Sequence, residues 1–206
     1  MPRRRDGLER RDALLDAALR CFSRSGVLAV GIEEIRREAA ASPSSVYNLF
    51  SSLNDLTLAL LTRTFERLFS HLVAGVDQTR SARNLVETLV DAHLEWILDH
   101  PDQGRFMYQG TALEFTASAS ETLQRRKADL LAPIVAHMAP FVRAGLLPSW
   151  SVLQFDVVVL GASHEACRRF LAGAPLDPDW MRKELPRLAW WSVAAERRAV
   201  RRGGKR

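Results

Sequence analysis

A run of short polar side chains near the N-terminus is the part of this 206-residue sequence best suited to hydrogen-bonding chemistry. At helical spacing, Val46, Leu49 and Phe50 fall on one face, which leaves the polar groups on the others. Those polar groups belong to Ser44, Ser45, Tyr47 and Asn48. Such a surface can hydrogen-bond to base edges and phosphates in a DNA major groove. The alternative is an ordinary helical hairpin with a solvated face.

Catalytic motifs are incomplete elsewhere in the chain. His164-Glu165 begins like the zinc motif H-E-x-x-H, but Arg168 occupies the place of the second histidine. The sequence has no glutamate three residues before a histidine, no C-x-x-C, no phosphate-binding glycine loop and no G-x-S-x-G. We therefore expect no enzyme, no catalytic residue, no metal site and no cofactor.

Two short helices joined by a tight turn are predicted to position the polar groups. In the first helix, Ile32, Ile35 and Ala39 share one face. Ala40 and Ala41 then form the turn. The next helix is predicted to start at Ser42-Pro43, because the serine oxygen can cap free N–H groups and proline suits the first helical position. A two-helix unit with a polar second helix fits a DNA major groove.

The flanking segments add a helix on each side. The upstream helix has an inward stripe and ends at Ser25-Gly26, where the glycine can adopt the left-handed cap. Downstream, Ser52 and Asp55 form a capping-box-like start for a long helix that runs to about Val76. The upstream stripe consists of Leu14, Ala18, Cys21 and Phe22.

This order of elements resembles the N-terminal DNA-binding domain of the TetR family of bacterial transcriptional regulators. The matching stretches are RRDALLDAALRCFSRSG and GIEEIRREAAASPSSVYNLFSSLNDL, about the first quarter of the chain. The resemblance implies an all-α fold, with a helix-turn-helix DNA-binding domain over 1–55 and a helical ligand-binding and dimerisation domain over 56–206. The candidate DNA-binding residues are Ser42, Pro43, Ser44, Ser45, Tyr47, Asn48, Arg36 and Arg5.

The chain departs from the family pattern at several positions. Ala40 stands where the family usually has glycine, so a positive φ there is predicted to be mildly strained. Arg36 replaces a small alanine, and Gly31 occupies the usual cap of the first short helix. Pro43-Ser44 replaces a lysine-glycine pair and Leu53 replaces a lysine, so two cationic phosphate contacts are missing. An interaction protein that has lost specific DNA binding is therefore the alternative function.

The net charge of +5 comes from the two ends of the chain. Residues 1–11 carry five arginines and a net +3, residues 196–206 carry a net +5, and residues 12–195 carry a net −3. A basic tail is usually only solvated. Beside a recognition unit, the N-terminal arginines before the first helix become a candidate phosphate or minor-groove arm.

The sequence from residue 57 onward is helical throughout, and 47% of the chain is hydrophobic. The sequence as a whole contains no transmembrane span and no signal peptide, so we expect a cytoplasmic protein with two reduced, buried cysteines. Large apolar and amphipathic side chains in the middle helices suit an apolar pocket, although such stripes are more often plain core. The candidate ligand residues are His93, Trp96, Phe106, Met107, Tyr108, Phe115, His137 and Phe141.

The last two predicted helices, 151–172 and 179–200, form a candidate association surface, since small residues on the first permit close helix approach. An intramolecular core pair is the alternative. The candidate dimer residues are Gly161, His164, Leu188 and Trp191. The resemblance implies a homodimeric repressor that binds a palindromic operator on double-stranded DNA and is released by a small, largely apolar or aromatic effector. Activation in place of repression stays open.

Overall fold

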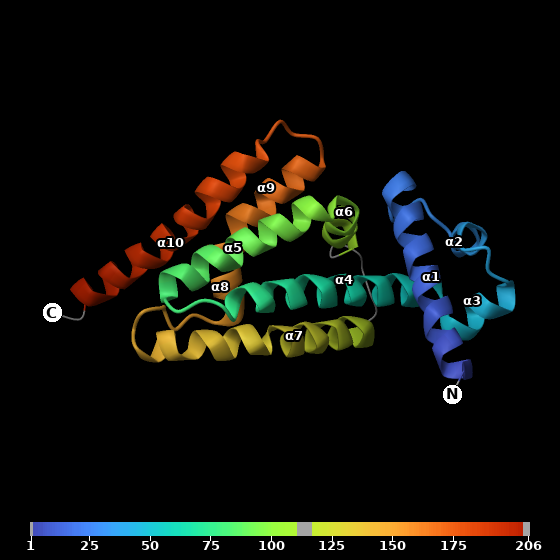
Figure 1. The fold of residues 1–206 in the computed structure, drawn as a ribbon, viewed down its shortest axis with the longest axis horizontal. Coiled ribbons are helices and arrows are strands. Elements are labelled where there is room, and N and C mark those ends of the chain that lie inside the picture. Colours follow the sequence, from blue (N-terminus) through green and yellow to red (C-terminus); the bar gives the residue numbers. More distant parts are fainter. Residues whose placement is uncertain (1, 111–116, 204–206) are drawn as a thin grey trace. The chain divides into compact units, whose positions relative to one another are not determined.

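A computed structural model describes the backbone of residues 2–110 and 117–203 and, within these, the side chains of 7–110 and 121–196. Every regular element in this part of the chain is helical, as predicted (Figure 1). No described helix is long and apolar enough to cross a membrane. The helices are Pro2–Ser25 (α1), Ile32–Glu38 (α2), Pro43–Leu49 (α3), Leu53–Val76 (α4), Ala82–Asp99 (α5), Pro101–Gly110 (α6), Ala117–Arg143 (α7), Val152–Phe155 (α8), Asp156–Leu160 (η1, a π-helix), Gly161–Leu171 (α9) and Pro178–Gly203 (α10).

The helices divide into two compact units. Unit 1 comprises Met1–Glu66 and Asp102–Lys127, and unit 2 comprises Arg67–Pro101 and Ala128–Arg206. The division passes through α4 and α7, so each of these helices contributes to both units. Unit 1 extends beyond residues 1–55, the range of the predicted domain, because it includes the first part of α4 and α6 from Asp102 onward.

Unit 1 is built on an apolar stripe along α1. Leu14, Ala18, Cys21 and Phe22 are all buried, as their spacing predicts. The ring of Phe22 stacks on Phe106 of α6, with centroids 5.5 Å apart. Helix α1 ends at Ser25, and Gly26 follows with a φ of 82°, the left-handed cap expected there. The α6 helix is held in unit 1 by this stack.

The N-terminal arginines are part of a helix, which corrects the expectation that they precede it. Helix α1 begins at Pro2, and its first half has the sequence PRRRDGLERRDA. Arginine, leucine and glutamate favour helices, and proline is tolerated in the first turn, so the helix extends through the basic segment. A basic helical extension thus replaces the predicted arm.

In unit 2, α10 lies along α5 and also packs against η1 and α9 (Figure 1). The buried face of α5 includes Leu85, Leu89, Trp96 and Ile97. Helix α4 packs beside this helix at Gly75, where an added Cβ would make ordinary contacts with Thr88 at 3.4 Å and Ala92 at 3.5 Å.

The segment from Val152 to Leu171 is continuous helix, as predicted, but it contains the π-helix η1 in its middle. A capping box starts it: the Ser151 hydroxyl accepts from the Gln154 N–H, and the Gln154 side chain accepts from the Ser151 N–H. Two prolines, Pro133 and Pro140, lie inside α7, and Pro186 lies inside α10. Each removes one backbone donor from its helix.

Candidate DNA-binding interface

Helix α3 is capped as its sequence predicts. The Ser42 hydroxyl accepts a hydrogen bond from the Ser45 N–H at 3.2 Å and donates to the Ser45 hydroxyl at 3.0 Å. It also lies 3.1 Å from the hydroxyl of Ser44. Pro43 occupies the first turn, where no N–H is required. These bonds fix the start of α3 and hold the three serine hydroxyls together at its N-terminus.

The two faces of α3 differ in exposure. Val46 and Phe50 are buried in unit 1, which orients the helix. Tyr47 is 55% exposed, and Asn48 is also exposed. These two side chains are therefore free of the core of unit 1 and available to a large partner. Contact of Ser42, Pro43, Ser44, Ser45, Tyr47 and Asn48 with DNA stays a prediction.

Arg36 is hydrogen-bonded within unit 1, and its contact with DNA stays a prediction. Its Nε donates to Glu33 Oε2 at 2.8 Å, and its Nη1 donates to the carbonyl oxygen of Ala41 at 3.0 Å. The side chain is half-buried between α2 and the turn. Arg5 lies in α1, but its side chain is outside the described residues.

Ion pairs connect α2 and α4 to α1. Arg20 and Arg24 both donate to Glu38, at 2.8 and 2.9 Å. Hydrogen bonds from Arg20, and then from Arg24, lower the pKa of the Glu38 carboxyl below its usual range. From α4, Arg63 donates to Asp16 at 2.7 Å. Both sets of contacts fix the short helices against the long one, although exposed pairs stabilise only weakly.

The predicted departures are visible at the helix ends. Gly31 is the N-cap of α2 and offers no side-chain cap. Ala40 has a φ of 48°, so the predicted positive φ at a non-glycine residue is confirmed. Ser52 caps α4 by accepting from the Asp55 N–H at 3.1 Å, while the Asp55 carboxylate accepts from the Ser51 N–H at 2.9 Å. In a regular capping box the Asp55 carboxylate would accept from the N–H of Ser52 itself, so here the second bond of the box is made one residue earlier in the chain.

The candidate ligand residues are distributed over both units, and their role in ligand binding stays a prediction. Phe106, Met107 and Tyr108 belong to unit 1, whereas the other described candidates belong to unit 2. Within unit 2, Trp96 stacks on His100 at 4.9 Å, and His137 lies 6.2 Å from Phe141 and 3.0 Å from the Thr79 hydroxyl. His93 contacts the ring of His164. Phe115 lies outside the described residues.

His93 is fully buried on α5. Its ring makes an edge contact with that of His164 on α9, with centroids 4.5 Å apart. Burial, followed by the charge of His164, holds the pKa of His93 well below its ordinary value. His93 is therefore neutral in the folded protein near neutral pH. His164 in turn lies 3.6 Å from a carboxylate oxygen of Asp156 in η1.

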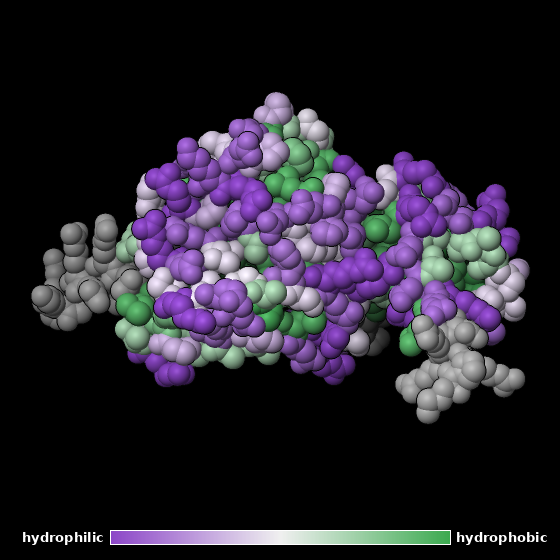
Figure 2. Space-filling model, viewed as in Figure 1, coloured by the Kyte–Doolittle hydropathy of each residue, from purple (hydrophilic) through white to green (hydrophobic). Residues whose placement is uncertain are grey.

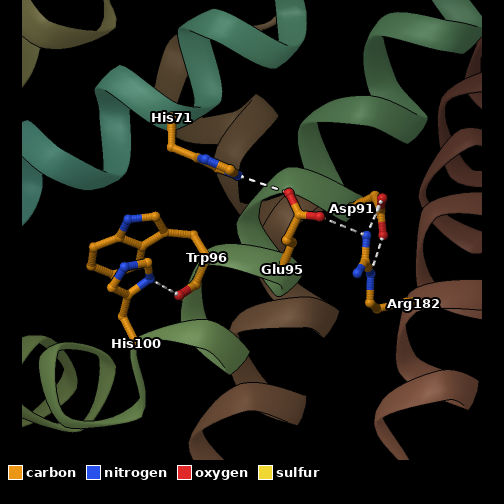
Figure 3. A network of polar contacts seen from close by, with 6 residues as sticks. All are labelled: His71, Asp91, Glu95, Trp96, His100 and Arg182. Carbon is orange, nitrogen blue, oxygen red and sulfur yellow. Dashed lines mark hydrogen bonds and ion pairs between the residues drawn. The ribbon is translucent and has the colours of Figure 1, made fainter.

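A polar groove in unit 2 was not predicted. It has a volume of about 450 Å³ and is lined from α4, α5 and α10. Figure 3 shows Glu95 between His71 and Arg182, at 3.1 and 3.2 Å, while Arg182 also donates twice to Asp91 at 2.9 Å. The hydrogen bonds that Asp91 accepts from Arg182 raise the pKa of the Arg182 guanidinium above its usual range. Four-residue spacing of Glu87, Asp91 and Glu95 on one helix face was the signal for it in the sequence.

The candidate dimer residues lie on α9 and α10. Gly161 and His164 are half-buried, whereas Leu188 and Trp191 are 42% and 54% exposed. Arg187 covers the Trp191 ring at 5.4 Å. Further exposed apolar side chains on α8 and η1 are those of Val152, Leu153, Val157 and Val158. The face of the molecule shown in Figure 2 is largely hydrophilic.

Comparisons with known proteins agree with this geometry. Residues 14–60 match the family model of the bacterial regulatory proteins, tetR family. The HTH-type transcriptional regulator BetI of Rhizobium meliloti is 36% identical over 81 residues, 39% of this chain and 40% of that protein. The HTH-type transcriptional activator FasR of Mycolicibacterium smegmatis is 35% identical over 96 residues, 47% of this chain and 43% of that one. The chain thus matches about two fifths of the length of these relatives.

Solved structures share the fold over most of the chain. A TetR family transcription regulator from Marinobacter aquaeolei has a TM-score of 0.74 at 19% identity, covering 94% of this chain and 98% of that one. The regulator FadR of Bacillus subtilis, solved in complex with stearoyl-CoA, has a TM-score of 0.71 at 11% identity, covering 88% and 98%. Residues 14–60, which include the capped α3 and the helix-turn-helix unit, thus match the tetR family of bacterial regulatory proteins, and the chain as a whole shares its all-helical fold with these solved regulators.

Proposed function

We propose that the chain is a DNA-binding transcriptional repressor that binds a palindromic operator as a homodimer and is released by a small effector. The observation that carries the proposal is the exposed polar face of α3, with Tyr47 and Asn48 projecting from a helix whose start is capped and whose other face is buried. A two-fold dimer presents two such helices to the two halves of a palindrome. Binding in the cytoplasm follows from this role.

The proposed dimer uses the exposed apolar surface of α8, η1 and α10. Val157, Leu188 and Trp191 lose their contact with water when a second copy covers them. In an isologous two-fold interface, the same patch is used by both copies, so one such surface is sufficient. Gly161 and His164, the other two predicted interface residues, lie on α9, which directly follows η1.

The proposed effector binds unit 2. A small, largely apolar or aromatic molecule matches the chemistry of the aromatic side chains of Trp96 and Phe141 better than that of the charged groove beside Arg182. Such a molecule acts only through its different affinity for the DNA-binding and the released arrangement. FadR of Bacillus subtilis, with its bound stearoyl-CoA, supports binding of a small molecule on this fold.

Selection of binding sites from random DNA with the purified full-length protein tests the function. We expect a palindrome to be enriched. Tyr47→Phe should weaken all sites about equally, and Asn48→Ala should relax the preference at particular positions, by roughly 1–3 kcal/mol each if the contact is direct. Asn84→Ala, an exposed asparagine on α5 of unit 2, is the matched control. Binding of both α3 variants as tightly as wild type contradicts this assignment of the surface.

A second candidate function is an interaction protein without specific DNA binding. It is favoured by Leu53 and Pro43-Ser44, which replace cationic residues typical of the family. If the folded dimer enriches no sequence, this alternative replaces the repressor.

A further inference from the structure

The turn between α2 and α3 has a complete Schellman closure on an unusual residue. The Ala41 N–H donates to the Arg36 carbonyl at 3.0 Å, and the Ala40 N–H donates to the Arg37 carbonyl at 3.1 Å. This pattern requires a left-handed residue at the position of Ala40, where glycine is normally found. Ala40 has a φ of 48°, and among the described residues it is the only non-glycine residue with a positive φ. Its Cβ therefore disfavours the conformation that the turn needs.

The Arg36 side chain closes a second bond around the same alanine. Its Nη1 donates to the Ala41 carbonyl at 3.0 Å, while its own carbonyl accepts from the Ala41 N–H. Arg36 and Ala41 are thus joined in both directions, with Ala40 inside the ring. Glu33 accepts from the Arg36 Nε at 2.8 Å and holds the guanidinium in place. Charge-assisted bonds of this kind are stronger than neutral ones.

Side-chain packing gives the turn little support. Residues 39–41 are all alanines and border a hollow of about 200 Å³. The other residues around this hollow include Arg10, Ala13 and Leu14 from α1. Methyl groups beside empty space make few contacts. The conformation of the turn therefore depends mainly on its hydrogen bonds. Among the bonds described above, one comes from a side chain of α2, namely the bond from the Arg36 guanidinium to the Ala41 carbonyl.

We propose that Arg36 is a positioning residue for DNA recognition: its guanidinium holds Ala40 in the left-handed conformation and thereby fixes where α3 starts. Ala41 immediately precedes Ser42, the N-cap of α3, so any change in the turn is passed directly to the helix. A glycine at position 40 adopts this conformation without help, so the clamp compensates for the alanine. The inference rests on the proposed function and replaces the expectation that Arg36 contacts DNA.

The test compares four full-length proteins with wild type on the selected palindrome: Arg36→Ala, Ala40→Gly, the double variant, and Arg37→Ala as the control. Arg37 is the neighbouring arginine of α2, and its Nε donates to the Glu33 backbone and not to the turn. We expect Arg36→Ala to weaken binding roughly tenfold, the scale of one charge-assisted hydrogen bond. Ala40→Gly alone should change affinity by less than about twofold, and the double variant should recover most of the loss.

The salt dependence of binding separates positioning from contact. A lost phosphate contact flattens the slope of log affinity against log salt by roughly 0.9 per phosphate, hence by nearly two units per dimer. A positioning residue leaves the slope unchanged. We therefore expect Arg36→Ala to bind more weakly at the wild-type slope. A flattened slope, a loss no larger than that of Arg37→Ala, or no recovery in the double variant overturns the proposal.

Thermal unfolding keeps the inference testable without DNA. The increase in Tm from Ala40→Gly should be smaller in the Arg36→Ala background than in wild type, because without the clamp Ala40 can leave the strained conformation and glycine then has less strain to relieve. Equal increases in the two backgrounds overturn the clamp. If wild type and the Arg37→Ala control enrich no DNA sequence, the proposed function fails, and the unfolding cycle still decides whether Arg36 supports the turn.

Discussion

Gly161 allows the proposed dimer interface to be tested with little effect on the single chain. A Cβ built at this position meets nothing within 4 Å, so a leucine can be placed there without a clash inside the protomer. Gly161 also has helical backbone angles, with a φ of −55°. Replacing a helical glycine by leucine should raise the free energy of unfolding of one protomer by roughly 0.5–1 kcal/mol.

The dimer should respond in the opposite direction. If a second copy packs against Gly161, the leucine overfills that contact at a cost of typically about 1–3 kcal/mol. The dissociation constant of the dimer then rises by about fivefold to 150-fold. A more stable protomer that dimerises more weakly is the combination expected from an interface, and a residue away from an interface cannot produce it.

Sedimentation velocity over a concentration series measures the dissociation constant, and chemical denaturation of the dissociated protein measures protomer stability. Gly7→Leu is the control, since Gly7 lies in α1 of unit 1 and a Cβ there also meets nothing within 4 Å. It should raise helix stability and leave dimerisation unchanged. An unchanged dissociation constant for Gly161→Leu refutes the reasoning and moves the interface away from α9.

Three further predictions concern the basic helix, the core and pH. Deleting residues 2–11 should flatten the slope of log affinity against log salt by several units per dimer, at roughly 0.9 per phosphate, whereas deleting 201–206 should barely change that slope. Salt titrations of both truncated proteins on one duplex measure the two slopes. Equal slopes for the full-length protein and the 2–11 deletion assign no DNA contact to the N-terminal arginines. Trp96→Ala should lower the free energy of unfolding by about 3–5 kcal/mol, measured by urea denaturation, because the buried indole leaves a cavity beside His100. The lowered pKa of His93 means that the unfolded chain binds a proton first as pH falls, so stability present above pH 6.5 is lost progressively below it. His93→Leu should reduce this loss in denaturation curves recorded at about pH 7.5 and about pH 5.5, and an unaltered pH dependence excludes His93 as its source.

Helix boundaries were the part of the fold that the sequence predicted best, because local signals determine them. Ser42-Pro43 marked the start of α3, and Ser25-Gly26 marked the end of α1. The extent of α1 was underestimated because charge suggested a free arm, whereas arginine is also a good helix former. For residues 2–11, helix propensity predicts a helix and the cluster of positive charge suggests a free arm, and only the structure distinguishes the two.

The candidate sites were harder to predict because they depend on partners distant in sequence. Nothing near Phe106 indicates that it stacks on Phe22 in unit 1 and not on an aromatic group of unit 2. Arg182 pairs with Asp91, 91 residues earlier in the chain. For Arg36, sequence spacing placed the side chain on an outer face of α2, but it could not reveal that the guanidinium returns to the backbone of the turn.

The π-helix η1 has a consequence for how the surface of this protein can change in evolution. In a regular helix, Val158 lies three residues after Phe155 and shares its buried face. In η1, Val158 is 39% exposed, whereas Val159 and Leu160, four and five residues after Phe155, are both buried. A π-turn behaves as a one-residue insertion into an α-helix. Loss of a single codon between 156 and 160 therefore returns the helix to a regular repeat and rotates the side chains before it by about 100° relative to those after it. The apolar residues offered to a second copy would then be different ones, so the choice of partner subunit can be altered in one genetic step without any substitution.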